Sequence, residues 1–344
     1  MRSIVLSGIR QLEIREEPLP VIQNDTDVLI RMGVVGVCGS DIHYYETGRI
    51  GTQVVEFPFR IGHECSGTVE EVGSAVRRVQ PGDKVAVDPA VSCGQCDQCL
   101  SGRPHTCRNL RFLGNPGELD GCLAEYLVMP EASCYPVNTE MSLANAAFVE
   151  PLSIGVYAAE LMDAAKAEKI AVLGSGPIGL SVLGSALARG VEKAYVTDKI
   201  NDRLQVASIA GAKWTGNPDE TDVVSDIREQ ELLLDAVFEC CGEQDALDQA
   251  IQLLKPGGEL LIVGIPEPNR ISFDINDLRH KEITIKNVRR QNDCVRPAIQ
   301  LIEQGKIDTD LLITHQYDFE TTADAYDLVS GYRDGVVKAT IMFE

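Results

Sequence analysis

A glycine-rich turn between a strand and a helix constrains the fold of this chain more than any other feature. Residues 174–179 read Gly-Ser-Gly-Pro-Ile-Gly and fit the pattern G-x-G-x-x-G. An apolar run at 169–173 precedes the turn, and an apolar helical run at 177–188 follows it. In that setting the glycines allow a tight turn and bring backbone N–H groups close to a pyrophosphate. Without this setting, the hexapeptide would be compatible with an ordinary strand–helix turn.

The pattern beyond the turn predicts a doubly wound parallel sheet, because strands alternate with helices. Helices are expected at 201–210 and 244–254. Further strands are expected at 194–197, 236–239, 259–263 and 283–286. Asp198 follows the second strand, and a carboxylate there can accept hydrogen bonds from ribose hydroxyls while it repels a 2′-phosphate. This predicts NAD, although Lys199 and Arg203 keep NADP open.

The first 150 residues have a different pattern. Short β-type runs at 28–32, 67–72 and 84–87 are separated by Gly, Pro and Asp, which indicates an all-β domain with long loops. A chain of 344 residues can form two such cores. We therefore expect three parts: a β domain at 1–150, a dinucleotide domain at 151–289 and a C-terminal segment at 290–344. The C-terminal segment is expected to form a helix at 295–304 and a strand at 337–343 and to return to the first domain.

Four cysteines in one loop have the spacing C-x2-C-x2-C-x7-C: Cys93, Cys96, Cys99 and Cys107. This spacing predicts one tetrahedral zinc ion with no open coordination position, and therefore a structural site. Apart from Cys38, the cysteines outside this loop are expected to be small buried apolar side chains. They are Cys65, Cys122, Cys134, Cys240, Cys241 and Cys294.

Composition limits the partners and the compartment. A net charge of −21 argues against nucleic acid and anionic membranes, which favour basic surfaces. The N-terminal residues lack the apolar core of a signal peptide, and no apolar stretch approaches the length of a membrane span. Eleven cysteines without an export signal indicate reduced thiols and metal ligands, so we expect a cytoplasmic protein.

A second possible metal site is spread along the first domain, in Cys38, His63, Glu64 and Glu150. Each of these residues alone is compatible with a buried or surface structural role. Together a cysteine, a histidine and a carboxylate can hold zinc and leave one coordination position open for water or substrate. That open position is what a catalytic zinc requires.

These motifs together resemble the zinc-containing medium-chain alcohol dehydrogenases, and in particular their polyol (sorbitol and xylitol) branch. The stretch G-H-E-x-x-G at 62–67, the cysteine loop and the glycine turn occur in the family's order, over essentially the whole chain. The resemblance implies a GroES-like β domain with an inserted Rossmann domain. It also implies two zinc ions per chain, NAD as cofactor and a homo-dimer or homo-tetramer.

The resemblance also implies roles for individual residues. Cys38, His63 and Glu64 would surround the catalytic zinc, and Glu150 would ligate it directly or through water. Zinc would favour ionisation of the substrate hydroxyl, hydride would pass to the nicotinamide, and Ser40 and His43 would relay the proton. The implied cofactor contacts are Gly174, Gly176, Pro177, Ile178, Gly179, Asp198, Arg203, Cys240, Val263, Gly264 and Val288.

Two segments bear on the substrate. Tyr44 matches a pocket residue of polyol dehydrogenases, with ordinary packing as the alternative, and Arg290 matches their pocket arginine. Arg289 and Gln291 replace aromatic residues that sorbitol dehydrogenases usually carry, and a second cation could favour an aldonate. The expected function is NAD-dependent oxidation of a secondary hydroxyl of a polyol or sugar derivative to a ketone. The alternatives are threonine 3-dehydrogenase, an aldonate dehydrogenase or a non-enzymatic nucleotide-binding protein.

Overall fold

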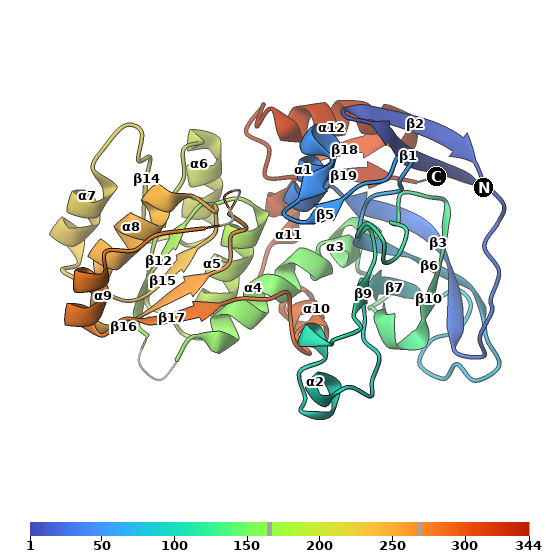
Figure 1. The fold of residues 1–344 in the computed structure, drawn as a ribbon, viewed down its shortest axis with the longest axis horizontal. Coiled ribbons are helices and arrows are strands. Elements are labelled where there is room, and N and C mark those ends of the chain that lie inside the picture. The colour runs from blue at the N-terminus through green and yellow to red at the C-terminus, as the bar shows by residue number, and fades with distance from the viewer. Residues whose placement is uncertain (164–166, 267, 269, 344) are drawn as a thin grey trace. The chain divides into compact units, whose positions relative to one another are not determined.

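A computed structural model describes residues 1–163, 167–266, 268 and 270–343. The chain forms two compact units, one of residues 1–150 with 313–344 and one of residues 151–312 (Figure 1). The chain therefore leaves the first unit after Glu150, where the sequence pattern changes. Residues 290–312 belong to the second unit, so the returning segment begins later than the sequence analysis expected.

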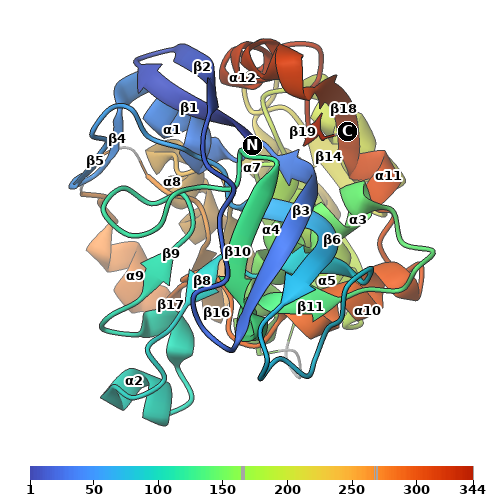
Figure 2. The ribbon, with the colours of Figure 1, turned by 90° about the vertical axis from the view of Figure 1, so that its right-hand side faces the viewer.

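The first unit is built on a seven-stranded sheet with the order β11-β7-β6-β3-β19-β18, and β10 also pairs with β3. Its neighbouring strands are antiparallel except β18 and β19, which are parallel. Figure 2 shows β10, β3 and β6 side by side. The strands are β3 (Asp27–Gly36), β6 (Glu64–Val72), β7 (Lys84–Val87), β10 (Tyr126–Pro130), β11 (Cys134–Pro136), β18 (Ile313–Asp318) and β19 (Lys338–Met342).

Smaller elements complete this unit. The strands are β1 (Arg2–Gly8), β2 (Gln11–Glu16), β4 (Arg49–Ile50), β5 (Gln53–Val54), β8 (Ala90–Val91) and β9 (Arg111–Phe112). The helices are α1 (Gly39–Thr47), α2 (Asp97–Leu100), η1 (Pro104–Thr106), η2 (Glu131–Ser133), α3 (Leu143–Ala147), η3 (Phe319–Thr321) and α12 (Thr322–Ser330). Alternating side chains of the central strands, such as Ile30, Met32 and Ile341, form a core with α1 and α12.

The second unit is a six-stranded parallel sheet with the order β14-β13-β12-β15-β16-β17. The strand order reverses between β12 and β15, and ligands bind beyond the carboxyl ends of strands at such a switch point. The strands are β12 (Lys169–Leu173), β13 (Lys193–Thr197), β14 (Trp214–Gly216), β15 (Leu234–Glu239), β16 (Leu254–Ile262) and β17 (Thr284–Asn287). The doubly wound sheet predicted from the sequence is confirmed.

Helices connect these strands. They are α4 (Val149–Leu161), which begins at the end of the first unit, α5 (Pro177–Ala188), α6 (Asn201–Ile209), α7 (Val223–Gln230), α8 (Gln244–Leu253), α9 (Ile275–Lys281), α10 (Val295–Glu303) and α11 (Thr309–Leu312). A Cβ on Gly184 of α5 would lie 3.1 Å from Ile307, so the segment after α10 packs on this unit. This contact explains why residues 290–312 stay with the second unit.

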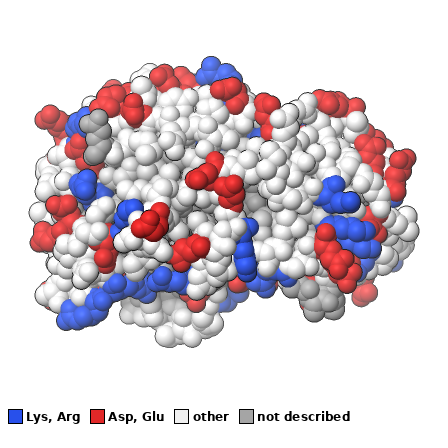
Figure 3. Space-filling model, turned by 180° about the vertical axis from the view of Figure 1, so that it is seen from behind, with Lys and Arg blue, Asp and Glu red and all other residues white. Residues whose placement is uncertain are grey.

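The distribution of surface charge and the apolar character of the helices both concern the kind of partner that the protein can have. Acidic side chains are scattered among basic ones over the face in Figure 3 and form no single block there. Among the described residues, no helix combines the length and the apolar character that crossing a membrane would require.

Candidate metal and dinucleotide sites

Helix α1 carries several of the predicted site residues. Cys38 is its N-cap, and the backbone N–H of Cys38 donates to the Asp41 carboxylate at 3.2 Å. Ser40 Oγ donates to Cys38 Sγ at 3.4 Å. Ser40, His43 and Tyr44 are spaced three and four residues apart, so they share one face of the helix. The helix therefore presents a thiol, a hydroxyl and an imidazole together.

His63 is buried beside the same helix. Its Nδ1 lies 3.4 Å from Asp41 Oδ1, and its ring centroid lies 5.3 Å from that of Phe112. Burial alone would lower the pKa of His63, but the charges of Asp41 and Cys38 raise it well above its usual value. The orientation by Asp41 leaves Nε2 as the ring nitrogen for another partner.

The Glu64 carboxylate forms an ion pair that the sequence analysis did not foresee. Both oxygens accept from Lys338 Nζ, at 2.8 and 2.6 Å, and the two side chains are each 2% exposed. Lys338 Nζ also donates to the Val37 carbonyl at 3.0 Å. Burial would lower the pKa of Lys338, but Glu64 and then Cys38 raise it above its usual value. Lys338 therefore neutralises a carboxylate at the predicted metal site.

Three of the four predicted catalytic-zinc residues form one group. Ligand atoms of Cys38, His63 and Glu64 all lie within 4.8 Å of one another, whereas Glu150 is outside this group. Glu150 is buried near the start of α4. Burial raises its pKa to about 7, His63 opposes this rise and Glu64 adds to it.

The donor set fits a zinc ion. Sulfur, imidazole nitrogen and carboxylate oxygen are the ligands that zinc takes in catalytic sites, with one position left open. Although burial would lower the pKa values of His63 and Lys338, the acidic groups Asp41 and Glu64 raise them. A divalent cation would satisfy the same thiol and carboxylate groups.

The four-cysteine loop fits a second zinc ion. Sulfur–sulfur distances are 3.5 Å for Cys96 to Cys99, 3.8 Å for Cys96 to Cys107 and 3.4 Å for Cys93 to Cys107. Tetrahedral zinc with Zn–S bonds of about 2.3 Å needs sulfurs about 3.8 Å apart. Backbone N–H groups of Cys99 and Arg108 lower the pKa of Cys96 to about 6, whereas burial raises that of Cys99 to about 11. The sequence prediction of a closed metal lobe agrees with this geometry.

The glycine turn has the geometry that a pyrophosphate needs. It joins β12 to α5, whose N-cap is Gly176 and whose first residue is Pro177. Gly174 has a φ of 96°, which favours glycine, and a Cβ on Gly179 would lie 1.8 Å from the Gly174 carbonyl oxygen. Ile178 follows on the first turn of α5. The glycines therefore carry no side chain of their own between the turn and an anion at the N-terminus of α5.

Asp198 and Arg203 lie beside the turn. Asp198 Oδ2 accepts from the Ser175 N–H at 2.6 Å and from Ser175 Oγ at 3.1 Å, and Oδ1 accepts from the Ile200 N–H at 2.9 Å. These bonds fix the orientation of the carboxylate just after the end of β13. The Arg203 guanidinium is buried, and its Nη1 would lie 3.5 Å from a Cβ on Gly176.

The remaining predicted cofactor residues lie just beyond the carboxyl ends of the strands. Cys240 N–H donates to Leu173 O at 2.8 Å, and Val288 N–H donates to Ile262 O at 2.9 Å. Val263 and Gly264 follow β16 directly. The prediction that Cys241 is buried is wrong, because this residue is exposed in the turn after β15, and Cys240 is only half-buried.

The two predicted substrate residues lie in different units. Tyr44 is 1% exposed, and its hydroxyl donates to Gln53 Oε1 at 3.4 Å. The neighbouring Tyr45 packs against Tyr326 at 5.4 Å between ring centroids and therefore has a structural role. Arg290 is half-buried with a φ of 54°, whereas Arg289 is exposed.

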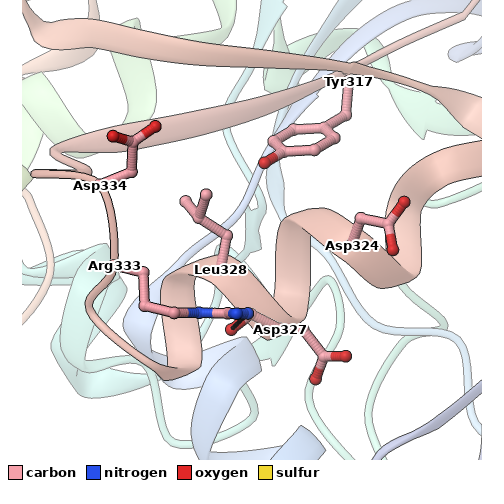
Figure 4. A pocket seen from close by; sticks show the side chains of 6 residues that line it. All are labelled: Tyr317, Asp324, Asp327, Leu328, Arg333 and Asp334. Atoms are coloured by element: carbon pink, nitrogen blue, oxygen red, sulfur yellow. Dashed lines mark hydrogen bonds between the residues drawn. The ribbon is translucent and has the colours of Figure 1, made fainter.

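A separate open pocket of about 500 Å³ is formed by the C-terminal part of the first unit (Figure 4). It is lined by Tyr317, Asp324, Asp327, Leu328, Arg333 and Asp334. Asp327 accepts from the Tyr45 hydroxyl at 2.8 Å and from Arg10 at 3.1 Å, and these contacts anchor α12. None of the predicted site residues lines this pocket.

Sequence reasoning missed Asp41 and Lys338. Asp41 lies three residues after Cys38, which is the spacing of a helix cap. That spacing was the only local signal for Asp41. Lys338 is 274 residues from Glu64 and had no local signal. Asp41 contacts His63 and Lys338 contacts Glu64, so both residues belong to the predicted metal site.

Known proteins are similar to this chain in both of its units. Residues 24–139 match the alcohol dehydrogenase GroES-like domain, and residues 177–304 match the zinc-binding dehydrogenase domain. Sorbitol dehydrogenase of Bacillus subtilis is 36% identical over 343 residues, 99% of this chain and 97% of its own. An oxidoreductase of unknown specificity from Escherichia coli is 31% identical with a TM-score of 0.94, covering 100% and 99% of the two chains. An alcohol dehydrogenase from Escherichia coli CFT073 in complex with NADH is 29% identical with a TM-score of 0.91, covering 100% and 99%.

The chain belongs to the zinc-containing medium-chain alcohol dehydrogenase family, in its polyol dehydrogenase branch. It is an NAD(P)-dependent zinc alcohol dehydrogenase. The predicted fold, with a GroES-like domain and an inserted Rossmann domain, is confirmed.

Proposed function

We propose that this enzyme oxidises a secondary hydroxyl of a polyol or sugar derivative to a ketone, with Cys38, His63 and Glu64 around the catalytic zinc and Glu150 as a further ligand, directly or through water. The observation that carries this proposal is the group of a half-buried thiol, a buried imidazole and a buried carboxylate within 4.8 Å of one another, next to the Ser40 hydroxyl. The loop of Cys93, Cys96, Cys99 and Cys107 would hold the structural zinc.

The roles of the protein groups follow from their positions. Bound zinc supplies a Lewis acid that favours ionisation of the substrate hydroxyl. Ser40 accepts the released proton, and His43, which shares its helix face, passes the proton to solvent. Asp41 keeps the His63 ring in one orientation through its contact with Nδ1. Asp198 and the turn at 174–179 hold the dinucleotide.

A chain of polar side chains near Tyr44 supports a substrate with several hydroxyls. Gln53 accepts from Tyr44 and donates to Glu118 Oε1 at 3.4 Å, and Asn115 donates to Glu118 Oε2 at 3.4 Å. Buried polar groups favour ligands that can pair with them, because an unpaired partner costs about 1–3 kcal/mol. Sorbitol and xylitol fit this chemistry, and the additional cation Arg289 makes an aldonate the second candidate.

A substrate panel tests the proposal. The NAD-dependent rate is measured with sorbitol, xylitol, an aldonate and threonine, before and after treatment with a chelator. We expect chelator-sensitive NADH production with a polyol or the aldonate. Turnover of threonine alone would contradict the proposal, and a protein that binds zinc and NAD but oxidises none of them would indicate a non-enzymatic role.

A single substitution tests the proposed proton path. Ser40→Ala should retain zinc and lower turnover by roughly 100-fold, the scale of general acid–base catalysis. Ser74→Ala is the matched control, because Ser74 is exposed and its hydroxyl donates to Asp25. Unchanged turnover in Ser40→Ala would remove this residue from the path.

We also propose a homo-oligomer in a reducing compartment such as the cytoplasm. Strand β17 is at the edge of its sheet, and an open edge can pair with a second chain. The cysteine thiols of the metal loop need a reducing environment to stay available for zinc. Light scattering coupled to gel filtration measures the assembly, and a monomeric mass would contradict it.

A further inference from the structure

A buried carboxylate outside the predicted site lies at the dinucleotide end of the second unit. Glu239 is the last residue of β15 and is 0% exposed. It pairs with Leu173 of β12 and Ile262 of β16, so it stands between the ends of two strands whose following residues are expected to contact the cofactor. A buried carboxylate needs hydrogen-bond donors to offset its loss of hydration, and the contacts of Glu239 identify these donors.

One oxygen of Glu239 holds the turn that follows its own strand. Oε1 accepts from the N–H groups of Cys241 at 2.7 Å and Gly242 at 2.5 Å. The backbone carbonyl of Glu239 accepts from Val263 and Gly264, at 2.8 and 2.9 Å. The other oxygen, Oε2, has no hydrogen-bond partner among the described residues. Glu239 therefore links the turn at 240–242 to the segment after β16. Backbone N–H groups compensate the negative charge of its carboxylate.

The turn that Glu239 holds is in close contact with the glycine turn. A Cβ on Gly174 would lie 3.1 Å from Cys241 Cβ and 3.2 Å from the Cys240 carbonyl carbon. On the other side, a Cβ on Gly264 would lie 2.5 Å from the Gly242 nitrogen and 2.8 Å from Glu239 Oε2. The turn at 240–242 is thus packed closely against both segments, and neither Gly174 nor Gly264 has space for a side chain beside it.

From these contacts we infer that Glu239 is a positioning residue for the dinucleotide: by fixing the turn at 240–242, it fixes the backbone of Gly174 that must approach the pyrophosphate. Glu239 acts through the turn and contacts no reacting atom. The inference rests on binding of the dinucleotide at this turn and is independent of which substrate is oxidised.

The test measures NADH affinity rather than activity. NADH binding to the zinc-loaded protein is followed by the fluorescence of the bound cofactor, for the unchanged protein, Glu239→Ala and Glu239→Gln. Alanine removes the acceptor of two backbone N–H groups, of which that of Gly242 is buried, and we expect the Kd for NADH to rise about tenfold or more. Glutamine keeps one oxygen acceptor, so its Kd should stay within about threefold of the unchanged protein.

Glu231→Ala is the matched control for general destabilisation. Glu231 pairs with Lys169 and Lys193, which begin β12 and β13 at the opposite end of the same sheet. This variant should unfold at lower temperature but retain its affinity for NADH. The inference is overturned if Glu239→Ala binds NADH normally, if Glu231→Ala loses as much affinity, or if Glu239→Gln is as weak as Glu239→Ala. Failure of the unchanged protein to bind NADH would overturn the NAD assignment together with this inference.

Discussion

Removal of Lys338 should strongly destabilise the first unit, because it leaves a carboxylate buried without its counter-ion. In Lys338→Met, Glu64 loses two charge-assisted hydrogen bonds of 2.8 and 2.6 Å in a site where both partners are 2% exposed. Methionine fills much of the space of the lysine stem, so lost packing is a small part of the effect. Breaking one side of a buried ion pair costs about 3–5 kcal/mol of unfolding free energy.

The loss of unfolding free energy in Lys338→Met should depend on pH and on the residue at position 64. Glu64 without Lys338 can take up a proton, which removes the unpaired charge, so the loss should be smaller at pH 5 than at pH 8. For the same reason Glu64→Gln combined with Lys338→Met should recover part of the stability that Lys338→Met loses. Zinc should also reduce the loss, because it supplies positive charge to the same carboxylate.

The measurement is urea unfolding of zinc-free and zinc-loaded protein, followed by circular dichroism at both pH values. Lys199→Met is the control, since Lys199 forms an exposed pair with Asp219 at 3.7 Å, and exposed pairs contribute about 0–1 kcal/mol. If zinc-free Lys338→Met were within 1 kcal/mol of the unchanged protein at pH 8, the reasoning about the buried pair would be refuted.

Three further predictions concern the other sites. Cys99→Ser should lower the zinc content from two ions per chain to one, and elemental analysis of the purified protein would contradict this if two ions remained. Asp198→Ala should reduce the ratio of kcat/KM for NAD over NADP, and an unchanged ratio would show that Asp198 does not select the cofactor. Two lysines lower the pKa of Glu231 below its usual value. The stability from this group is therefore present above the unfolded pKa of about 4.3 and is lost as pH falls through the lower folded value. Glu231→Gln should flatten the acid side of the plot of stability against pH, measured by urea unfolding between pH 6 and 3, and an unchanged profile would contradict the assignment.

The sequence predicted those parts of the site that depend on local spacing. The cysteine loop and the glycine turn are each contained in a short segment, so the pattern and the geometry coincide. The ion pair of Glu64 and Lys338 joins the start of β6 to the start of β19, and only the sheet brings these residues together. Residues 290–312 were assigned to the wrong unit because periodicity identifies a helix but does not show which core it packs against.

The placement of β19 has a consequence for synthesis of the protein. This strand pairs with β3, and Gly36 is opposite Thr340, so about three hundred residues separate the two partners in the chain. The second unit is a continuous stretch that can be complete before β19 leaves the ribosome, whereas residues 34–36 of β3 lack their β19 partner until that strand has been made. Chains that stop early would therefore lack both Lys338 and the strand that covers this edge. The ion pair at the predicted metal site can therefore form only after β19 has been made.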